Sequence, residues 1–116
     1  MTDKTTLEPN SPYSLAHSMP NDSRQAAWQE QFATHGFDNT ELWNLDMSIA
    51  KFIRPRLERF LELTPTAFTD DELADLQTIL KAFELIEKEA LFDAEQGEIA
   101  EKGINLLPQY FFRLWY

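Results

Sequence analysis

Apolar side chains recur at helical spacing through residues 43–63, and this pattern constrains the fold more than any other. The apolar positions that recur at this spacing are Ile49, Ile53, Leu57 and Phe60, and Phe52 and Leu61 widen the face that they form. Intervals of three and four place them on one face of an α-helix, the face that a core requires. Pro55 lies inside the run. Because proline lacks an N–H and clashes with an earlier carbonyl, we expect a kink there, with the Arg56 guanidinium close enough to bind a carbonyl left without its donor.

The composition also favours helices. Valine is absent, only three glycines occur, and the chain is rich in Leu, Glu, Ala and Phe. β-branched residues are the ones that strands prefer, so a chain without valine leans towards helix. A length of 116 residues suits one modest core. The sequence therefore predicts an all-α fold, a compact bundle of about four helices with proline kinks and a flexible N-terminal arm.

Residues 1–21 form that predicted arm, because they hold three prolines among Ser, Thr, Asn and Asp and show no sustained apolar period. Residues 22–116 form the predicted single helical domain. Its first helix can be capped by Asp22 or Ser23, whose side chains accept hydrogen bonds from N–H groups of the first turn. Gly36 suits the left-handed position that follows a helix.

A capping box predicts the start of a later helix. Thr69 is followed three residues on by Glu72, so each side chain can accept a hydrogen bond from the backbone N–H of the other residue. We expect this helix to span about residues 70–95 and to end near Gly97. The side chains expected to be buried on it are Leu76, Ile79, Leu80, Phe83, Ile86 and Ala90.

A last helix is expected from residue 98 onward, with a kink at Pro108 and with Gly103 allowing close approach of a neighbouring helix. Five of residues 110–116 are aromatic. So apolar a stretch belongs either to the core or to an interface. We expect it to dock on the helix that contains Ile49 and Phe60.

The charges are unevenly distributed. The net charge is −10, and residues 64–103 hold eleven acidic and three basic residues, whereas residues 41–63 hold four of each. An acidic balance argues against a general binder of nucleic acid or anionic membranes, because phosphate contacts need Lys and Arg. The one basic cluster consists of Lys51, Arg54, Arg56 and Arg59. It either pairs with acids of the same chain, which we favour, or docks an acidic partner or the acidic helix of a second copy.

The residue patterns typical of catalysis or metal binding are missing. Without cysteine there is no thiolate nucleophile or Cys-based zinc site. Neither His17 nor His35 has an acidic residue three positions earlier, so the Glu-x-x-His pattern of metal-binding bundles is absent. His35 is interpreted as a favourable charge at a helix C-terminus. We predict a protein that is not an enzyme and uses no cofactor.

The sequence also favours a cytoplasmic location. The first residues contain no apolar segment typical of a signal peptide. No apolar run approaches the ~20 residues that a membrane span needs.

Residues 43–46, Trp-Asn-Leu-Asp, and residues 49–57, Ile-Ala-Lys-Phe-Ile-Arg-Pro-Arg-Leu, resemble a motif of small bacteriophage and prophage proteins. Those proteins look like Trp-Asn-Leu-Asp, then Ile-Ala-x-Phe-Ile-x-Pro-Arg-Leu, then a Tyr-Phe…Leu-Trp ending, which residues 110–115 match. The resemblance implies a phage-linked origin, hence the cytoplasm of a host cell, and a helical fold. It implies no activity and no site residue.

Three functions are considered from these observations, and the first is the one we favour. The first is a non-enzymatic, protein-binding accessory protein of phage type that modulates a host or phage protein. The second is an acidic nucleic-acid mimic that inhibits a DNA-binding defence enzyme, of the anti-restriction or anti-CRISPR class. The third is a virion assembly component, which would form a homo-oligomer. The candidate partner-binding residues are Asp70, Asp71, Asp75, Glu84, Glu87, Arg54 and Arg56.

Overall fold

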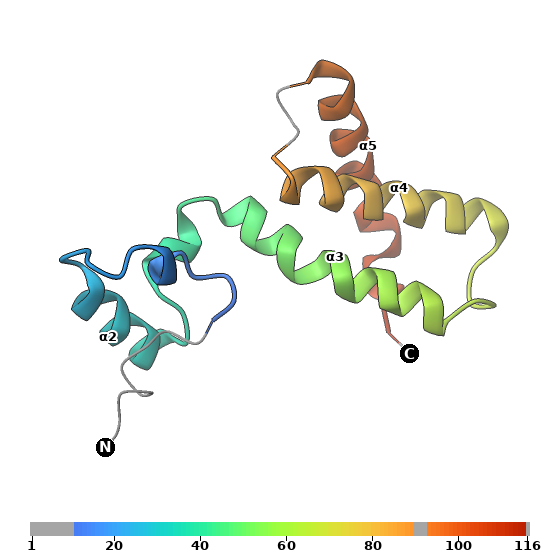
Figure 1. The fold of residues 1–116 in the computed structure, drawn as a ribbon. Coiled ribbons are helices and arrows are strands. Elements are labelled where there is room, and N and C mark those ends of the chain that lie inside the picture. Colours follow the sequence, from blue (N-terminus) through green and yellow to red (C-terminus); the bar gives the residue numbers. More distant parts are fainter. Residues whose placement is uncertain (1–10, 90–92, 116) are drawn as a thin grey trace. The chain divides into compact units, whose positions relative to one another are not determined.

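The computed structural model describes residues 11–89 and 93–115 (Figure 1). In these ranges all regular structure is helical, which confirms the predicted all-α fold. The elements in chain order are η1 (Ala16–Ser18), α2 (Gln25–His35), η2 (Asn39–Leu42), α3 (Leu45–Leu63), α4 (Asp70–Glu87), α5 (Ala94–Tyr110) and η3 (Phe111–Arg113), where η marks a 3-10 helix.

The chain divides into two compact units, Met1–Ser48 and Ile49–Tyr116. The predicted division, with an arm over residues 1–21 and one helical domain over residues 22–116, stays a prediction. The boundary falls within α3, so this helix begins in the first unit and continues into the second. Periodicity along one continuous helix gives no sign of such a boundary.

A buried hydrogen-bond network holds part of the predicted arm in the first unit. Asp38 is fully buried, and its carboxylate accepts hydrogen bonds from the hydroxyls of Ser14 and Thr40 and from the Thr40 N–H. The Leu15 N–H donates to Thr40 Oγ1 at 2.8 Å. A buried carboxylate needs such donors because burial removes its water. Residues 14 and 15 are therefore attached to η2, and residues 1–10 lie outside the described part of the chain.

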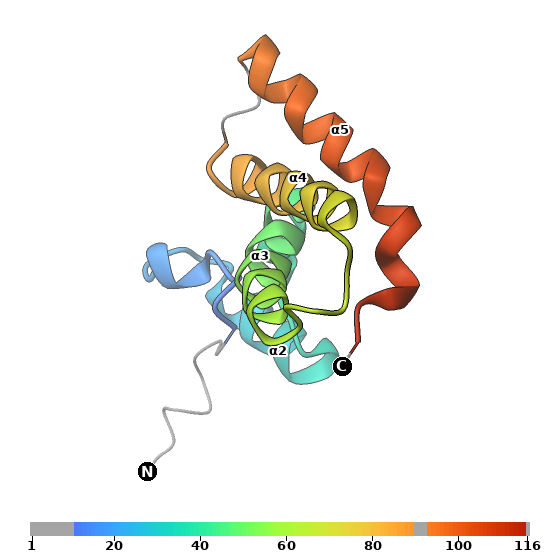
Figure 2. The ribbon, with the colours of Figure 1, turned by 90° about the vertical axis from the view of Figure 1, so that its right-hand side faces the viewer.

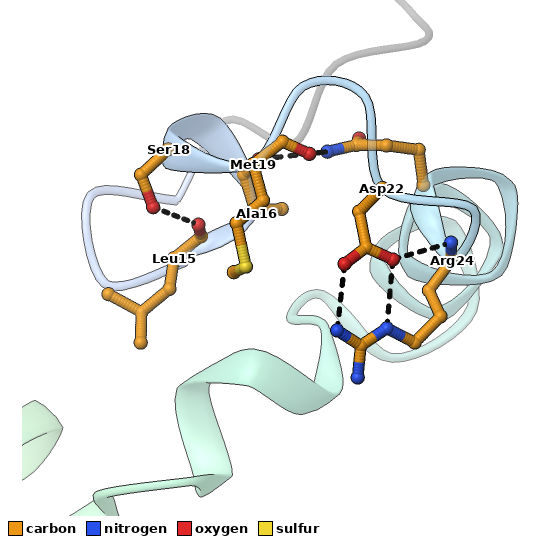
Figure 3. A network of polar contacts seen from close by, with 7 residues as sticks. Leu15, Ala16, Ser18, Met19, Asp22 and Arg24 are labelled. Atoms are coloured by element: carbon orange, nitrogen blue, oxygen red, sulfur yellow. Dashed lines mark hydrogen bonds and ion pairs between the residues drawn. The ribbon is translucent and has the colours of Figure 1, made fainter.

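The start of α2 differs from the prediction. Its N-cap residue is Arg24, and no side chain caps the helix. Asp22 instead accepts hydrogen bonds from the Arg24 backbone N–H at 2.8 Å and from the Arg24 guanidinium at 2.8 and 2.9 Å (Figure 3). This guanidinium lies 5.0 Å from the ring of Trp28, which is buried, and 5.4 Å from the ring of Trp43. The Asp22 carboxylate therefore binds Arg24 and does not cap α2, as the sequence had suggested it would.

Left-handed residues follow two of the helices. Gly36 has a φ of +85°, and its N–H donates to the Phe32 carbonyl at 2.8 Å, which confirms the predicted end of α2. Glu89 has a φ of +57° and follows the end of α4. The prediction that α4 continues to about residue 95 is therefore wrong, and Ala90 lies outside the described residues. Asp93 caps α5, so Gly97 lies inside this helix and does not end its predecessor.

α3 continues through Pro55 as a single helix. Arg56 Nη1 donates to the Phe52 carbonyl at 2.8 Å. The carbonyl that Pro55 leaves without a backbone donor is that of Lys51, so this contact is with a neighbouring carbonyl and not with the predicted one. The prediction of the buried face is only partly correct. Leu57 is buried together with Ala50, whereas Ile49 and Phe52 are 51% and 50% exposed. The side of α3 that meets the core is thus rotated away from those two residues.

α4 and α5 pack closely in the second unit (Figure 2). The predicted capping box is present, with Thr69 Oγ1 accepting from Glu72 N–H at 3.2 Å and Glu72 Oε1 accepting from Thr69 N–H at 2.9 Å. The buried residues of α4 are Leu76, Ile79, Ala82, Phe83, Leu85 and Ile86. Gly103 is buried on α5, and a Cβ there would lie 2.5 Å from Ala82 Cβ, which confirms the predicted close approach.

Candidate protein-interaction surface

Three of the candidate residues come together where α3 faces α4. Arg54 forms an ion pair with Glu87 through its Nε, and the Glu87 carboxylate raises the pKa of Arg54. Glu84, one turn before Glu87, pairs with Lys81 at 3.1 Å and with Lys88 at 3.9 Å. Lys81 is the main cause of the lowered pKa of Glu84. These charges are paired within the chain, and Arg54 is the member of the basic cluster that pairs here, as the sequence led us to expect.

The acidic residues near the start of α4 hold the C-terminal segment. The Tyr110 hydroxyl donates to Asp75 Oδ2 at 2.6 Å, and this contact raises the pKa of Tyr110 to about 12. The Arg113 guanidinium donates to the two carboxylate oxygens of Glu72 at 2.8 and 3.3 Å. Arg113, with help from the Thr69 N–H, lowers the pKa of Glu72 to about 2. Asp75 therefore has an internal structural role.

The remaining candidates lie apart from these contacts. Asp70 and Asp71 are exposed in the first turn of α4, where negative charge stabilises the positive end of the helix dipole. Arg56 is exposed on α3. Asp70 and Glu87 are about 25 Å apart along α4, given a rise of ~1.5 Å per residue. The seven predicted residues thus do not gather into one site.

Aromatic contacts fix the base of the C-terminal segment. Tyr110 is buried, and its ring packs edge-on against Phe68 with the ring centroids 6.5 Å apart. The Arg113 guanidinium lies 4.8 Å from the Phe68 ring and 5.9 Å from the Tyr110 ring. Phe68 in turn packs on Phe60 of α3 at 6.2 Å. The segment is therefore held mainly by α4 and Phe68. We had expected it to dock on α3, and in these contacts it meets α3 only indirectly, through Phe68.

Beyond this base, three large aromatic side chains face solvent. Phe111, Phe112 and Trp115 are 55%, 85% and 77% exposed, and we refer to them as the aromatic surface. Phe111 and Phe112 contact each other edge-on at 5.5 Å. The expectation that the stretch docks in the core is thus met by Tyr110 and not by these three residues. Arg113 was the feature of the sequence that indicated this exposure. A charged residue within an aromatic run is seldom fully buried unless it is paired, so part of such a run lies at the surface.

A second exposed strip runs along α3. It consists of Ile49, Phe52, Arg56, Arg59 and Leu63, and we call it the α3 stripe. The Arg56 guanidinium lies 4.1 Å from the Phe52 ring centroid. Arg59 Nη1 pairs with Glu62 at 2.8 Å, and both side chains are more than half exposed. The helical spacing of Ile49 and Phe52 predicted both as core residues, and it did not indicate an exposed stripe here.

Within the part of the chain that the structure describes, no group of three or more His, Asp or Glu side chains is placed to bind a metal ion. No helix in the same ranges combines the length and apolar character of a membrane span. Comparisons of this chain with protein-family models, with curated proteins and with solved structures find no match.

Proposed function

We propose that the protein is a non-enzymatic protein-binding module, of the accessory kind that phages carry to modulate a host or phage protein. The observation that carries the proposal is the aromatic surface. Phe112 and Trp115 expose most of their area to water although the residues beside them are firmly held. The phage-type role rests on the resemblance of residues 43–57 and 110–115 to small phage proteins.

Anchored, exposed aromatic side chains suit protein recognition. Aromatic residues are enriched among the few that supply most binding energy in interfaces. Ordering a segment on binding weakens affinity, and this cost is smaller when the segment is held beforehand. Tyr110 and Arg113 hold the backbone between them through Asp75 and Glu72. The aromatic surface is therefore presented on a base that the fold already fixes.

The arrangement of the acidic residues supports the alternative function, a nucleic-acid mimic, less than it supports a protein-binding module. A mimic needs a row of carboxylates directed at solvent, as a phosphate backbone presents its charges. On α4, Glu84 and Glu87 pair with cations, and Glu72 binds Arg113. Much of the charge of this helix is therefore neutralised within the chain, and no described contact favours the mimic over a protein-binding module.

Affinity capture with immobilised protein tests the proposal. Wild type, the double variant F112A/W115A and the control variant F37A are incubated with bacterial lysate, and captured proteins are identified by mass spectrometry. Phe37 is also exposed, at 38%, but lies in the first unit. We expect wild type and F37A to capture the same protein and F112A/W115A to lose it.

The captured protein, once purified, is then titrated calorimetrically with each variant. Loss of an interface hot spot costs about 2 kcal/mol or more, so F112A/W115A should bind at least about 30-fold more weakly. Equal affinity of F112A/W115A and wild type would contradict the proposal. So would the absence of any captured protein specific to the wild type.

A further inference from the structure

The aromatic surface is joined to the first turn of α4 by one ion pair. Arg113 lies between Phe112 and Trp115 in the chain. Its guanidinium donates to Glu72 Oε2 at 2.8 Å, and Asp71 directly precedes Glu72. Phe112 and Asp71 are each one residue, about 3.8 Å between Cα atoms, from a member of this pair, and both are exposed. Exposed rings and exposed carboxylates therefore share one corner of the second unit.

This corner carries an excess of negative charge. Its acidic residues, which we call the acidic rim, are Asp70, Asp71, Glu72 and Asp75 of α4. Arg113 is the one base that an ion pair among the described residues brings to the rim, so a net charge of −3 remains. Glu72 and Asp75 hold the C-terminal segment. Asp70 and Asp71 are exposed, and no ion pair joins either of them to another residue in the described ranges.

A cation bound at the same corner shows which chemistry suits it. The Arg113 guanidinium lies 4.8 and 5.9 Å from the rings of Phe68 and Tyr110. The same guanidinium binds Glu72, so aromatic rings and a carboxylate hold it together. A ring attracts a cation through its negative face, and a carboxylate adds charge-assisted hydrogen bonds. The aromatic surface and the two exposed acids of the rim offer the same combination to an incoming cation.

Other occupants fit this corner less well. A second copy that placed its aromatic surface here would bring two acidic rims together, and like charges placed opposite each other disfavour association. An anionic lipid surface suits exposed Trp and Phe side chains, but its phosphates would meet the carboxylates of the rim. An uncharged apolar segment would cover the rings and leave the rim without a counter-charge. A basic segment uses both features.

We propose that the aromatic surface and the acidic rim together bind a basic segment of the partner protein, whose Arg or Lys side chains lie over the exposed rings and pair with Asp70 and Asp71. This inference rests on the proposed protein-binding function and adds the chemistry of the partner. The rings supply most of the affinity, because binding removes their large exposed area from water. The carboxylates select basic partners over neutral and acidic ones and speed association.

Three labelled synthetic peptides test the inference. Each consists of four repeats of X-Leu-Gly, where X is Arg, Gln or Glu, so that length and apolar content are equal. Binding to the full chain is measured by fluorescence anisotropy at low and high salt. We expect the Arg peptide to bind at least about tenfold more tightly than the Gln peptide, and the Glu peptide to bind most weakly. The advantage of the Arg peptide should shrink at high salt, because ions screen exposed charges.

Aromatic variants test whether the peptide binds at this corner. F112A/W115A has the net charge of wild type, so the general attraction of a basic peptide to an acidic protein is unchanged in it. We expect this variant to bind the Arg peptide at least about tenfold more weakly. F37A removes an exposed ring of the first unit and should bind the peptide as wild type does.

Charge variants test the role of the rim. D70N/D71N should bind the Arg peptide at least about threefold more weakly than wild type. E98Q/E101Q removes the same number of charges from exposed positions of α5 and should stay within about twofold of wild type. D71N alone, with E101Q as its control, is the informative variant if circular dichroism shows that D70N/D71N is misfolded, because both acids lie in the first turn of α4.

Several outcomes would overturn the inference: no binding of the Arg peptide, equal affinity for the Arg and Gln peptides, or equal effects of D70N/D71N and E98Q/E101Q. A wild-type dimer that F112A/W115A dissociates in sedimentation experiments would identify a second copy as the occupant instead. Binding to phosphatidylglycerol vesicles in place of the Arg peptide would identify a lipid surface.

Failure of this inference is distinguishable from failure of the proposed function. A captured protein that is lost in F112A/W115A but binds D70N/D71N as tightly as wild type would support the proposed function and contradict the basic partner. If the inference holds, excess Arg peptide should displace the captured protein from immobilised wild type and excess Gln peptide should not.

Discussion

Gly103 lies at a close approach of α5 to α4, and replacing it with alanine tests the packing of the second unit. An added Cβ would lie 2.5 Å from Ala82 Cβ and 2.5 Å from the Thr78 carbonyl oxygen. Carbon atoms in contact prefer about 3.5–4.0 Å. Neither neighbour is the mobile end of a long side chain, so the two helices would have to move apart by about 1 Å.

Two opposing effects decide the magnitude. Alanine in a helix interior is about 1 kcal/mol more favourable than glycine. Overpacking a close contact costs about 1–3 kcal/mol, and contact with backbone places this case at the upper end. The expected net loss for Gly103→Ala is therefore about 2 kcal/mol. For a cooperative unit of this size, that loss lowers Tm by about 10 °C.

Thermal and urea unfolding followed by circular dichroism measure this difference. Asn105→Ala is the matched control, because Asn105 is exposed on the same helix and its replacement changes propensity without a clash. We expect the control to lie within about 0.5 kcal/mol of wild type. If Gly103→Ala melts at or above the wild-type Tm, the reasoning about the α4–α5 approach is refuted.

Three further predictions concern local features. Thr69→Ala should lower the free energy of unfolding by about 1 kcal/mol in urea titrations while Thr69→Ser retains stability, because the hydroxyl caps α4; equal losses in both would contradict this. Gly36→Ala should lose about 1 kcal/mol by the same measurement and Gly36→Asn less, because φ is +85°. The third concerns pH. The folded pKa of Glu72 is about 2 against an ordinary 4.5, so the contribution of its pair with Arg113 is complete above about pH 4.5 and is lost as the pH falls towards 2. The folded pKa of Tyr110 is raised from 10.0 to about 12, so its contribution is complete below pH 10 and is lost as the pH rises through 12. Arg113→Gln should reduce the acid limb and Tyr110→Phe the alkaline limb of stability measured against pH; unchanged limbs would contradict the assignments.

Several features of the fold were readable from local sequence because the physics that produces them is local. The capping box at Thr69 and Glu72 needs only two side chains three residues apart. Gly36 ends α2 because it tolerates a left-handed conformation at little cost. The all-α class follows in the same way from composition and helical spacing.

The end of α4 and the pairing of the candidate site residues could not be predicted from local sequence. The apolar spacing persists towards residue 90. It therefore does not reveal that α4 ends at Glu87 and that Asp93 caps the start of α5. Of the predicted site residues, Arg54, Glu84 and Glu87 do meet. Sequence does not show that such charges pair with each other, because the pairing depends on which helix lies opposite.

The sequence by itself determined that this chain forms helices, and it placed two of their caps. Only the tertiary structure decided which apolar residues are buried inside the fold and which remain exposed. On α3, Ile49 and Phe52 are as apolar as Leu57, yet only Leu57 is among the buried residues. Beyond Tyr110, Phe112 and Trp115 face solvent for the same reason. Burial depends on which side a neighbouring helix covers, and hydrophobic character alone does not specify that side.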